Sequence, residues 1–348
     1  MSDNLPSTRL VRLGQPATLE NLRLVTAESR QPGPGEVLVR VHASSLNYHD
    51  FAVVTGQIPT AEGRVPMSDG AGEVIAVGEA VDTAGPALPF RPGDRVMSTF
   101  FPRWSHGAVT KEATQGVPGD DVDGFACEYA VVPASGLTPQ PPGYSHAEAA
   151  TLPCAALTAW RALVVDGPLT AGETVVVQGT GGVSLFALQF AKALGATVIA
   201  TSSSDEKLER LRALGADHLI NYRTQPQWAR AVVEATGGRG ADHVVEVGGS
   251  STLNQSLRAC RVGGHIAMIG VLSGREGPVS TAMLMTKNIR LQGVTVGSRQ
   301  HQLDMVRALG VLGVRPIVDS HFPLERLADA FRHQESGRHF GKIVVDVT

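Results

Sequence analysis

TVVVQGTGGVSLFALQFAKALGATVIA, residues 174–200, is the stretch that decides the fold. Residues 174–178 are mostly β-branched and apolar, which is typical of a strand buried on both faces. Glycines then predict a sharp turn, and after it apolar residues recur at helical spacing until Gly195 ends the helix. These apolar positions are Val183, Phe186, Phe190 and Leu194. The stretch therefore predicts a strand, a glycine turn and a helix.

The glycine turn has the properties of a phosphate-binding loop. Glycines let the backbone approach a pyrophosphate closely, and a helix N-terminus offers unpaired N–H groups to it. Ser184 stands where the G-x-G-x-x-G fingerprint has its third glycine, and serine is small enough for tight packing. Residues 197–201 predict a second buried strand, as the fingerprint requires. We predict a dinucleotide site, with an ordinary tight turn as the alternative.

Length and charge narrow the class of protein. The 348 residues are enough for two domains, and 43% hydrophobic with 18% charged residues indicates a globular chain. The 30 basic and 33 acidic residues form no long block, which argues against nucleic acid or an anionic membrane as partner. No long apolar run and no signal-peptide pattern are present, so we expect a cytoplasmic protein.

The first half of the chain predicts short strands and many turns. Residues 36–42 alternate apolar with polar side chains, and residues 72–77 and 94–97 predict further strands. This pattern favours an irregular β-barrel. Residues 99–124 form a long irregular segment in which Phe101, Trp104 and His106 either cover a substrate mouth or fix a surface loop.

Six motifs in sequence order resemble the medium-chain dehydrogenase/reductase superfamily. They are EVLVRVHASSLN, SDGAGEVIAVG, RPGDRV, LPCAALTAWRAL, GTGGVS and GKIVV. The resemblance implies an α/β protein in which residues 1–155 and 298–348 form a GroES-like irregular β-barrel catalytic domain. Residues 156–297 would form a Rossmann domain with a doubly wound parallel sheet. The chain is most similar to the zinc-independent quinone oxidoreductase and enoyl reductase branch.

The positions of the zinc ligands in related zinc-dependent enzymes carry a different set of residues here. They are Asn47, Ser68 with Asp69, and Cys154, so one thiol remains beside an amide and a hydroxyl. Residues 99–124 replace the structural-zinc lobe and contain no cysteine. We expect no zinc at either position. Cys127, Cys154 and Cys260 are expected to pack as small apolar side chains, with catalytic use of Cys154 as the alternative.

The segment Asn47-Tyr48-His49-Asp50 matches the N-[FY]-x-D pattern of quinone reductases and enoyl reductase domains. The resemblance implies that Asn47 holds the substrate carbonyl or the nicotinamide ribose. Tyr48 and His49 are candidate proton donors, and an ordinary half-exposed histidine is the alternative for His49. Asp50 is expected to cap a helix that begins at Phe51.

The residues that follow the second Rossmann strand select the dinucleotide. NAD sites place a carboxylate there, whereas this chain has Ser202 at that position by the register of the family. The hydroxyls of Ser202 and Ser203 can donate to a 2′-phosphate, and Lys207 adds a compensating charge. Tyr222 ends the next strand, where similar NADPH-dependent reductases have a tyrosine. NADPH is therefore expected, with Asp205 as the N-cap of the following helix.

The remaining cofactor positions follow from the sheet and the resemblance. Residues 242–247, 265–269 and 291–296 predict further parallel strands, and ligands lie beyond the carboxyl ends of such strands. Residues 154–165 predict the helix between the domains. The resemblance implies a homodimer paired through the last predicted strand, whose apolar edge suits such pairing. The expected cofactor set comprises Asn47, Thr158, Gly179, Thr180, Gly181, Gly182, Val183, Gly248, Ile269, Val271, Ser298, Phe340 and Lys342. For Thr158 and Lys342 the alternatives are a backbone-bonded helical threonine and a surface charge.

The predicted function is hydride transfer from NADPH to a quinone or an α,β-unsaturated carbonyl in an interdomain cleft, without zinc. A second reading is an alcohol dehydrogenase or ketone reductase of the same superfamily, although it would lack the metal that stabilises an alkoxide. A third is a non-catalytic protein that binds NADPH.

Overall fold

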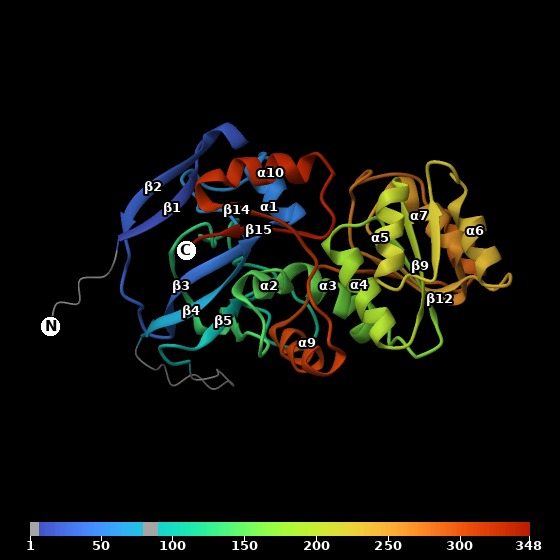
Figure 1. The fold of residues 1–348 in the computed structure, drawn as a ribbon, viewed down its shortest axis with the longest axis horizontal. Helices are drawn as coiled ribbons and strands as arrows, with labels where there is room; N and C mark the ends of the chain where they lie inside the picture. The colour runs from blue at the N-terminus through green and yellow to red at the C-terminus, as the bar shows by residue number, and fades with distance from the viewer. Residues whose placement is uncertain (1–6, 79–89) are drawn as a thin grey trace. The chain divides into compact units, whose positions relative to one another are not determined.

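The structure is a computed structural model that describes residues 7–78 and 90–348 (Figure 1). The chain divides into two compact units. The first comprises Met1–Ala155, Gly297–Gly310 and Val318–Thr348, and the second comprises Ala156–Val296 and Val311–Ile317. The expected division placed residues 311–317 in the first unit, whereas they group with the second. Residues 1–6 of the N-terminal segment lie outside the described residues. Among the described helices, none is long and apolar enough to cross a membrane.

The second unit contains a parallel sheet of six strands in the order β10-β9-β8-β11-β12-β13. Strand order reverses beside β8, which is the first strand of this sheet along the chain, and this confirms the doubly wound Rossmann-type fold. β13 is shorter than the predicted strand because residues 294–296 leave the ladder. The strands are β8 (Thr174–Gln178), β9 (Thr197–Ser202), β10 (His218–Asn221), β11 (Ala241–Glu246), β12 (Cys260–Met268) and β13 (Arg290–Gly293).

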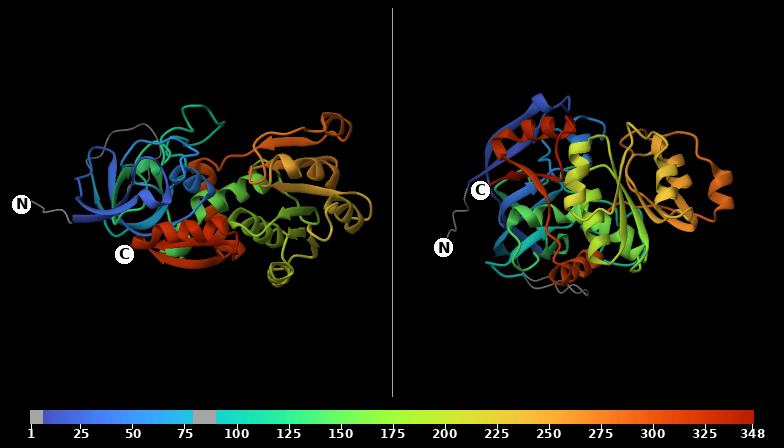
Figure 2. Two further views of the ribbon diagram at one scale, coloured as in Figure 1. Left: turned by 90° about the horizontal axis from the view of Figure 1, so that it is seen from above. Right: turned by 45° about the vertical axis from the view of Figure 1, so that its right-hand side comes forward.

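Helices cover both faces of this sheet (Figure 2). Alternate residues of a strand point to opposite faces. Val176 of β8 packs in one core with Trp228 and Leu257 from two of the helices, so its neighbours Val175 and Val177 point to the other face. Residues 152–165 are helical as predicted, with π-helical turns on either side of a short α-helix. The elements are η3 (Leu152–Ala156), α3 (Leu157–Trp160), η4 (Arg161–Val165), α4 (Gly182–Ala193), α5 (Asp205–Ala213), α6 (Trp228–Ala235), α7 (Ser250–Ala259) and α8 (Thr281–Thr286).

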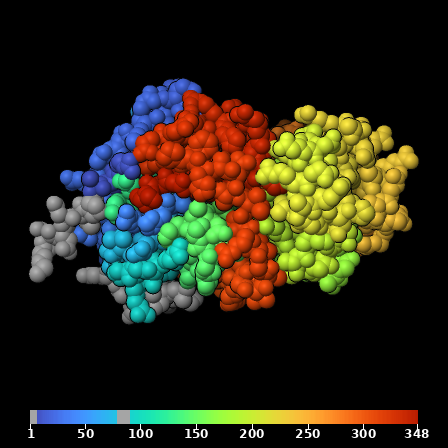
Figure 3. Space-filling view, in the orientation of Figure 1, coloured from blue at the N-terminus to red at the C-terminus, as the bar shows by residue number. Residues whose placement is uncertain are grey.

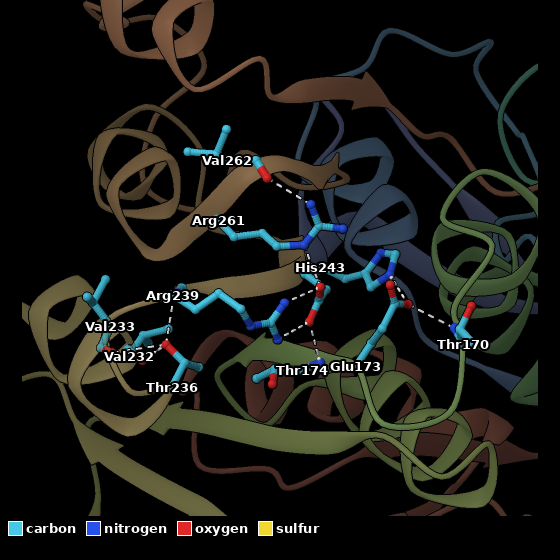
Figure 4. A network of polar contacts seen from close by, with 12 residues as sticks. Thr170, Glu173, Thr174, Val232, Val233, Thr236, Arg239, His243, Arg261 and Val262 are labelled. Carbon is cyan, nitrogen blue, oxygen red and sulfur yellow. Dashed lines mark hydrogen bonds and ion pairs between the residues drawn. The ribbon is translucent and has the colours of Figure 1, made fainter.

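Charged side chains fasten the amino ends of β8 and β11 (Figure 4). The buried carboxylate of Asp242 accepts hydrogen bonds from Thr174 N at 2.8 Å, from Arg239 Nη1 at 2.7 Å and from Arg261 Nε at 2.5 Å. Burial alone would raise the pKa of Asp242, but these donors hold it below its usual range. Because ligands of such sheets bind at the opposite, carboxyl ends, we assign this network to stability.

The first unit contains a mainly antiparallel sheet in the order β14-β15-β3-β4-β5-β7, with β6 paired to β3 and with β1 and β2 as a separate pair. This is the GroES-like domain. Its core joins Val39 and Val41 of β3 to Phe331 near the C-terminus, so residues from both chain ends lie side by side (Figure 3). The strands are β1 (Ser7–Leu13), β2 (Leu22–Glu28), β3 (Glu36–Ser45), β4 (Asp69–Val77), β5 (Arg95–Ser98), β6 (Tyr129–Pro133), β7 (Leu137–Pro139), β14 (Val318–Pro323) and β15 (Lys342–Asp346).

Short helices complete the first unit, and residues 99–124 pack against it. Phe101 and Trp104 are buried, the indole of Trp104 donates to Gly107 O at 3.0 Å, and Arg299 N donates to Trp104 O at 2.8 Å. His106 is exposed. These contacts favour a loop fixed by its aromatic side chains over a cover for a substrate mouth. The helices are η1 (Leu19–Asn21), α1 (Tyr48–Val54), η2 (Ala134–Gly136), α2 (His146–Ala150), α9 (Arg299–Leu312), η5 (Leu324–Arg326) and α10 (Leu327–Glu335).

Candidate functional site

A buried polar centre in the first unit is built around Asn47, which lies between β3 and α1. Its amide Nδ2 donates to Asp69 Oδ2 at 2.9 Å and to Ser68 Oγ at 3.2 Å. Its amide oxygen accepts a 2.6 Å hydrogen bond from Lys342 Nζ, which also donates to Leu46 O at 2.5 Å. All of these polar side chains are less than 9% exposed. The alternative that Lys342 is a surface charge is therefore wrong.

Two buried carboxylates flank this centre. Asp50 accepts hydrogen bonds from Asn47 N at 2.9 Å and from Ser68 N at 2.8 Å. Burial raises the pKa of Asp50, and burial raises the pKa of Asp69 to about 7 although the charge of Lys342 acts in the opposite direction. The centre thus contains one ammonium for two carboxyl groups, and this ammonium offsets part of their burial cost.

The capping arrangement of α1 differs from the prediction. The helix begins at Tyr48, not at Phe51, and Asn47 is its N-cap. Asp50 is the third helical residue, and its carboxylate returns to the backbone N–H of Asn47. This is one half of a capping box, which an Asn-x-x-Asp pattern allows. Asn47 is therefore fixed at the start of the helix, where its amide contacts Asp69 and Lys342.

The donors at the positions of the zinc ligands do not fit a catalytic zinc centre. The Asn47 amide oxygen already binds an ammonium, and Ser68 is a hydroxyl. Burial raises the pKa of the Cys154 thiol well above its ordinary value, whereas zinc binds the thiolate. Within residues 7–78 and 90–348, no cluster of three His, Cys, Asp or Glu side chains has a geometry that could hold a metal ion.

Tyr48 and His49, the candidate proton donors, lie on the first turn of α1. Tyr48 is exposed, with 42% of its surface accessible. His49 is half-buried, and its Nε2 lies 3.5 Å from the Asp120 carboxylate, while Phe100 packs edge-on to the ring. Tyr48 lies near the ring of Phe51, with ring centroids 6.4 Å apart, so His49, which has both a carboxylate and an aromatic neighbour, is the more constrained of the two.

The glycine turn of the second unit has room for a ligand. Gly179 has a φ of +71°, which a residue with a side chain rarely adopts, and a Cβ added at Gly179 or Gly181 would meet nothing within 4 Å. Thr180 lies between them, and Gly182 and Val183 begin α4. Open backbone at a helix N-terminus is the arrangement that binds a pyrophosphate.

Ser184 replaces the third glycine of the fingerprint and closes the turn. Its buried Oγ donates a 2.6 Å hydrogen bond to Gln178 O, at the end of β8. A residue without a polar side chain would leave this bond unmade. The serine therefore keeps the strand and the helix in close contact and adds a tie that glycine cannot supply.

Hydroxyl groups lie at the carboxyl end of β9. Ser202 Oγ accepts from Ser204 N at 3.2 Å, and Ser204 is the N-cap of α5, so the prediction that Asp205 caps this helix is wrong. The Asp205 carboxylate instead accepts a 2.6 Å hydrogen bond from Asn221 Nδ2. The side chain of Ser203 is half-buried, Lys207 lies in the first turn of α5, and Tyr222 follows β10 and is exposed.

Glu246 is a fully buried carboxylate at the end of β11 that the sequence analysis missed. It accepts hydrogen bonds from Gln178 Nε2 at 2.8 Å, Gly248 N at 2.8 Å and Thr252 Oγ1 at 2.6 Å, and also from Gly249 N and Ser256 Oγ. It thereby fixes the loop that contains Gly248. A carboxylate that follows Val244 and Val245 at the end of a predicted parallel strand was the available signal.

The other expected cofactor residues belong to different units. Thr158 is buried in α3, while Ile269 and Val271 follow β12 in the second unit. Ser298 and Phe340 belong to the first unit. Ser298 Oγ accepts from His301 N at 3.2 Å, and the Phe340 side chain is buried, with its N–H bonded to Asp319 Oδ1 at 2.8 Å. Local structure thus accounts for both residues of the first unit, and their role toward a cofactor stays a prediction.

Comparison with known proteins agrees with this architecture. A model of the alcohol dehydrogenase GroES-like domain matches residues 33–142, and a model of the zinc-binding dehydrogenase family matches residues 182–310. A zinc-type alcohol dehydrogenase-like protein of Schizosaccharomyces pombe is 44% identical over 90% of this chain and 91% of its own length. The chain belongs to the medium-chain dehydrogenase/reductase superfamily and is an oxidoreductase of that family.

Two solved structures illustrate the range of cofactors among similar proteins. An NAD-dependent alcohol dehydrogenase is 35% identical, with a TM-score of 0.88 over 98% of this chain and 100% of that chain. A crotonyl-CoA carboxylase/reductase in complex with NADP is 25% identical, with a TM-score of 0.85 over 98% of this chain and 95% of that chain. The family therefore indicates a nicotinamide cofactor without deciding between NAD and NADP.

Proposed function

We propose that the protein is a zinc-independent reductase that uses NADPH to reduce a quinone or an α,β-unsaturated carbonyl compound. The observation that carries the proposal is the hydrogen bond between Lys342 and Asn47. By the resemblance to the family, Asn47 stands at the position of a zinc ligand, and its amide oxygen is bonded to the Lys342 ammonium instead of a metal. The bound cofactor would supply the hydride, and the chain would supply orientation and hydrogen bonds.

The residues at the end of β9 support the preference for NADPH. Ser202 and Ser203 bring hydroxyls, which can donate to a 2′-phosphate, and Lys207 brings a positive charge. The Asp205 carboxylate, which would favour a ribose 2′-OH, is bonded to Asn221. Phosphate repulsion by Asp205 is thus reduced, and the glycine turn at residues 179–182 would hold the pyrophosphate.

An unsaturated acceptor suits the polar centre better than a simple ketone does. Reduction of a simple ketone places full negative charge on one oxygen, which zinc stabilises in many dehydrogenases. In an enone or a quinone that charge is delocalised over several atoms, so a nearby proton donor can serve without the full charge stabilisation that a metal gives. The similarity to a crotonyl-CoA carboxylase/reductase supports this choice. The second candidate, an alcohol dehydrogenase, is favoured by the names of the other relatives.

A panel of substrates tests the proposal. Purified protein is assayed with NADPH and with NADH against a quinone, an enone and a simple ketone, before and after chelation, with its metal content measured. We expect metal-free consumption of NADPH with the quinone or the enone. Stoichiometric zinc that is required for activity would establish the second candidate. Binding of NADPH without turnover would indicate a non-catalytic NADPH-binding protein.

We also propose a homodimer that forms through β13. This strand is at the edge of the sheet and has exposed residues, among them Arg290 and Gln292 near the half-buried Leu291. An unpaired edge strand can continue its ladder with the same strand of a second copy across a two-fold axis. Replacing Leu291 with proline removes a backbone donor from the edge. Sedimentation should then show a monomer where the unaltered protein is a dimer.

A further inference from the structure

His49 faces a carboxylate that lies 71 residues away in the chain. Its Nε2 is 3.5 Å from Asp120 Oδ2, and the side chains are only 22% and 17% exposed. This buried Nε2 has no hydrogen-bond partner among the described residues, so the carboxylate is the polar group that it meets. Phe100 packs edge-on to the imidazole, with ring centroids 5.2 Å apart, and limits its rotation.

Asp120 is held in place by its backbone and by its neighbours. Its carbonyl oxygen accepts a 2.6 Å hydrogen bond from Thr60 Oγ1. The next residue, Asp121, accepts from Gly116 N at 2.6 Å, and its carbonyl accepts from Arg64 Nη2 at 2.9 Å. The turn that presents the Asp120 carboxylate is therefore fixed at both ends, which keeps the carboxylate near the imidazole.

Carboxyl groups flank His49 on two sides. The carboxyl group of Asp50, on α1, and the carboxyl group of Asp120, on the turn, both interact electrostatically with His49. Burial raises the pKa of Asp120, and Asp121 adds to this rise, whereas His49 and Arg64 lower it. His49 is thus a half-buried imidazole that has a carboxyl group on either side.

We infer that Asp120 is a positioning residue that orients His49 as the proton donor of the reduction. This inference rests on the proposed function. In reduction of an enone, hydride from the reduced nicotinamide brings two electrons to the β-carbon, and the π electrons of the double bond move to form an enolate. The His49 imidazolium then gives its proton to the α-carbon, and the imidazole takes a proton from water. Asp120 stays ionised and holds the ring.

Three variants test the arrangement. Asp120→Asn removes the charge with little change in shape, His49→Gln removes the donor, and Glu112→Gln removes an exposed charge from the same segment as a control. The first readout is the titration of the His49 ring followed by NMR and assigned by its loss in His49→Gln. We expect a lower midpoint in Asp120→Asn and no change in Glu112→Gln.

The second readout is the pH profile of kcat with the best acceptor. We expect His49→Gln to lower kcat about 100-fold and to abolish the alkaline limb of the profile. Asp120→Asn should lower kcat about tenfold and move that limb to lower pH, with KM for NADPH within about twofold. A merely structural role for Asp120 would lower thermal stability without moving the limb.

The possible failures are distinguishable. An unaltered protein that reduces no acceptor overturns the proposed function and the donor role together. A His49 midpoint that is equal in the unaltered protein and in Asp120→Asn overturns the pairing, whatever the activity. Full activity of His49→Gln with an unchanged pH profile overturns the donor role and leaves the proposed reductase intact.

Discussion

Lys342 and Asn47 are joined by a 2.6 Å hydrogen bond although 295 residues separate them in the chain. The bond brings an ammonium from the start of β15 to the N-cap of α1. Asp50 and Asp69 lie beside the same amide, so the bond also places a positive charge among buried carboxyl groups. The centre therefore has charges that depend on one another, and removing one of them should affect the rest.

Lys342→Met should destabilise the protein by about 3–5 kcal/mol, because it removes one partner from a buried group of charges. The substitution keeps most of the side-chain volume but leaves Asn47 Oδ1 and Leu46 O without their donor. Denaturant unfolding measures the loss. The exposed Lys111 provides the control, since Lys111→Met should change stability by less than about 0.5 kcal/mol.

Adding Asp69→Asn to Lys342→Met should recover part of this loss, because it removes the carboxyl group that Lys342→Met leaves without a counter-charge. Strict additivity of the two single effects would argue against an electrostatic link between Lys342 and Asp69.

Glu246→Gln should lower the free energy of unfolding by about 2–3 kcal/mol and raise KM for NADPH. A glutamine has the same shape, but its amide nitrogen cannot accept a hydrogen bond. In one orientation the nitrogen faces the donors Gly248 N and Thr252 Oγ1. In the other it faces the donors Gln178 Nε2 and Ser256 Oγ. The loop at Gly248 should lose order. Unfolding and steady-state kinetics are the measurements, and the exposed Glu234→Gln is the control. An unchanged KM would separate this loop from cofactor binding.

Ser202→Asp should shift the preference toward NADH by about 10- to 100-fold in the ratio of kcat/KM values. A carboxylate at the end of β9 repels a 2′-phosphate and accepts a hydrogen bond from a ribose 2′-OH. Ser256→Ala, which removes a buried hydroxyl from α7 without adding a charge, serves as the comparison. A ratio that does not move would place the 2′-phosphate away from Ser202.

The protein should lose stability between pH 7 and pH 5 through His265. Burial lowers the pKa of His265 to about 4, with help from the positive charge of Arg290. The His265 side chain therefore binds a proton near pH 6.5 in the unfolded chain but not in the folded chain. Its contribution to stability is fully present above that pH and is lost as the pH falls toward 4. The expected loss at pH 5 is about 2 kcal/mol.

Unfolding at both pH values tests this dependence. His265→Asn should flatten the change, whereas the exposed His218→Asn should not. An equally steep loss in His265→Asn would assign the effect to other groups, such as His146, whose pKa burial also lowers to about 4.

The sequence predicted the nucleotide-binding half well because its signals are local. The run at residues 174–178 and the glycines that follow it determine a strand and a turn without reference to the rest of the chain. Helix starts were less certain. The N-caps are Asn47 instead of the expected Asp50 and Ser204 instead of the expected Asp205. All four side chains can accept a backbone hydrogen bond, so the sequence alone does not decide between them.

The contacts of the candidate site could not be predicted in the same way. The bonds from Lys342 to Asn47 and the approach of Asp120 to His49 join residues that are far apart in sequence. No periodicity in a single chain reports such pairs. Glu246 was also missed by the sequence analysis, although a carboxylate at the end of a predicted buried strand requires donors wherever it lies.

The position of β15 between β14 and β3 has a consequence for how the protein is made. During synthesis the first 155 residues leave the ribosome before the strand that completes their sheet has been translated. The second unit is contiguous over residues 156–296, so it can fold during synthesis. At that stage the sheet of the first unit is incomplete, because β15 has not yet paired with β3. A chain that ends before Ile343 would therefore fold the second unit but could not complete the first one.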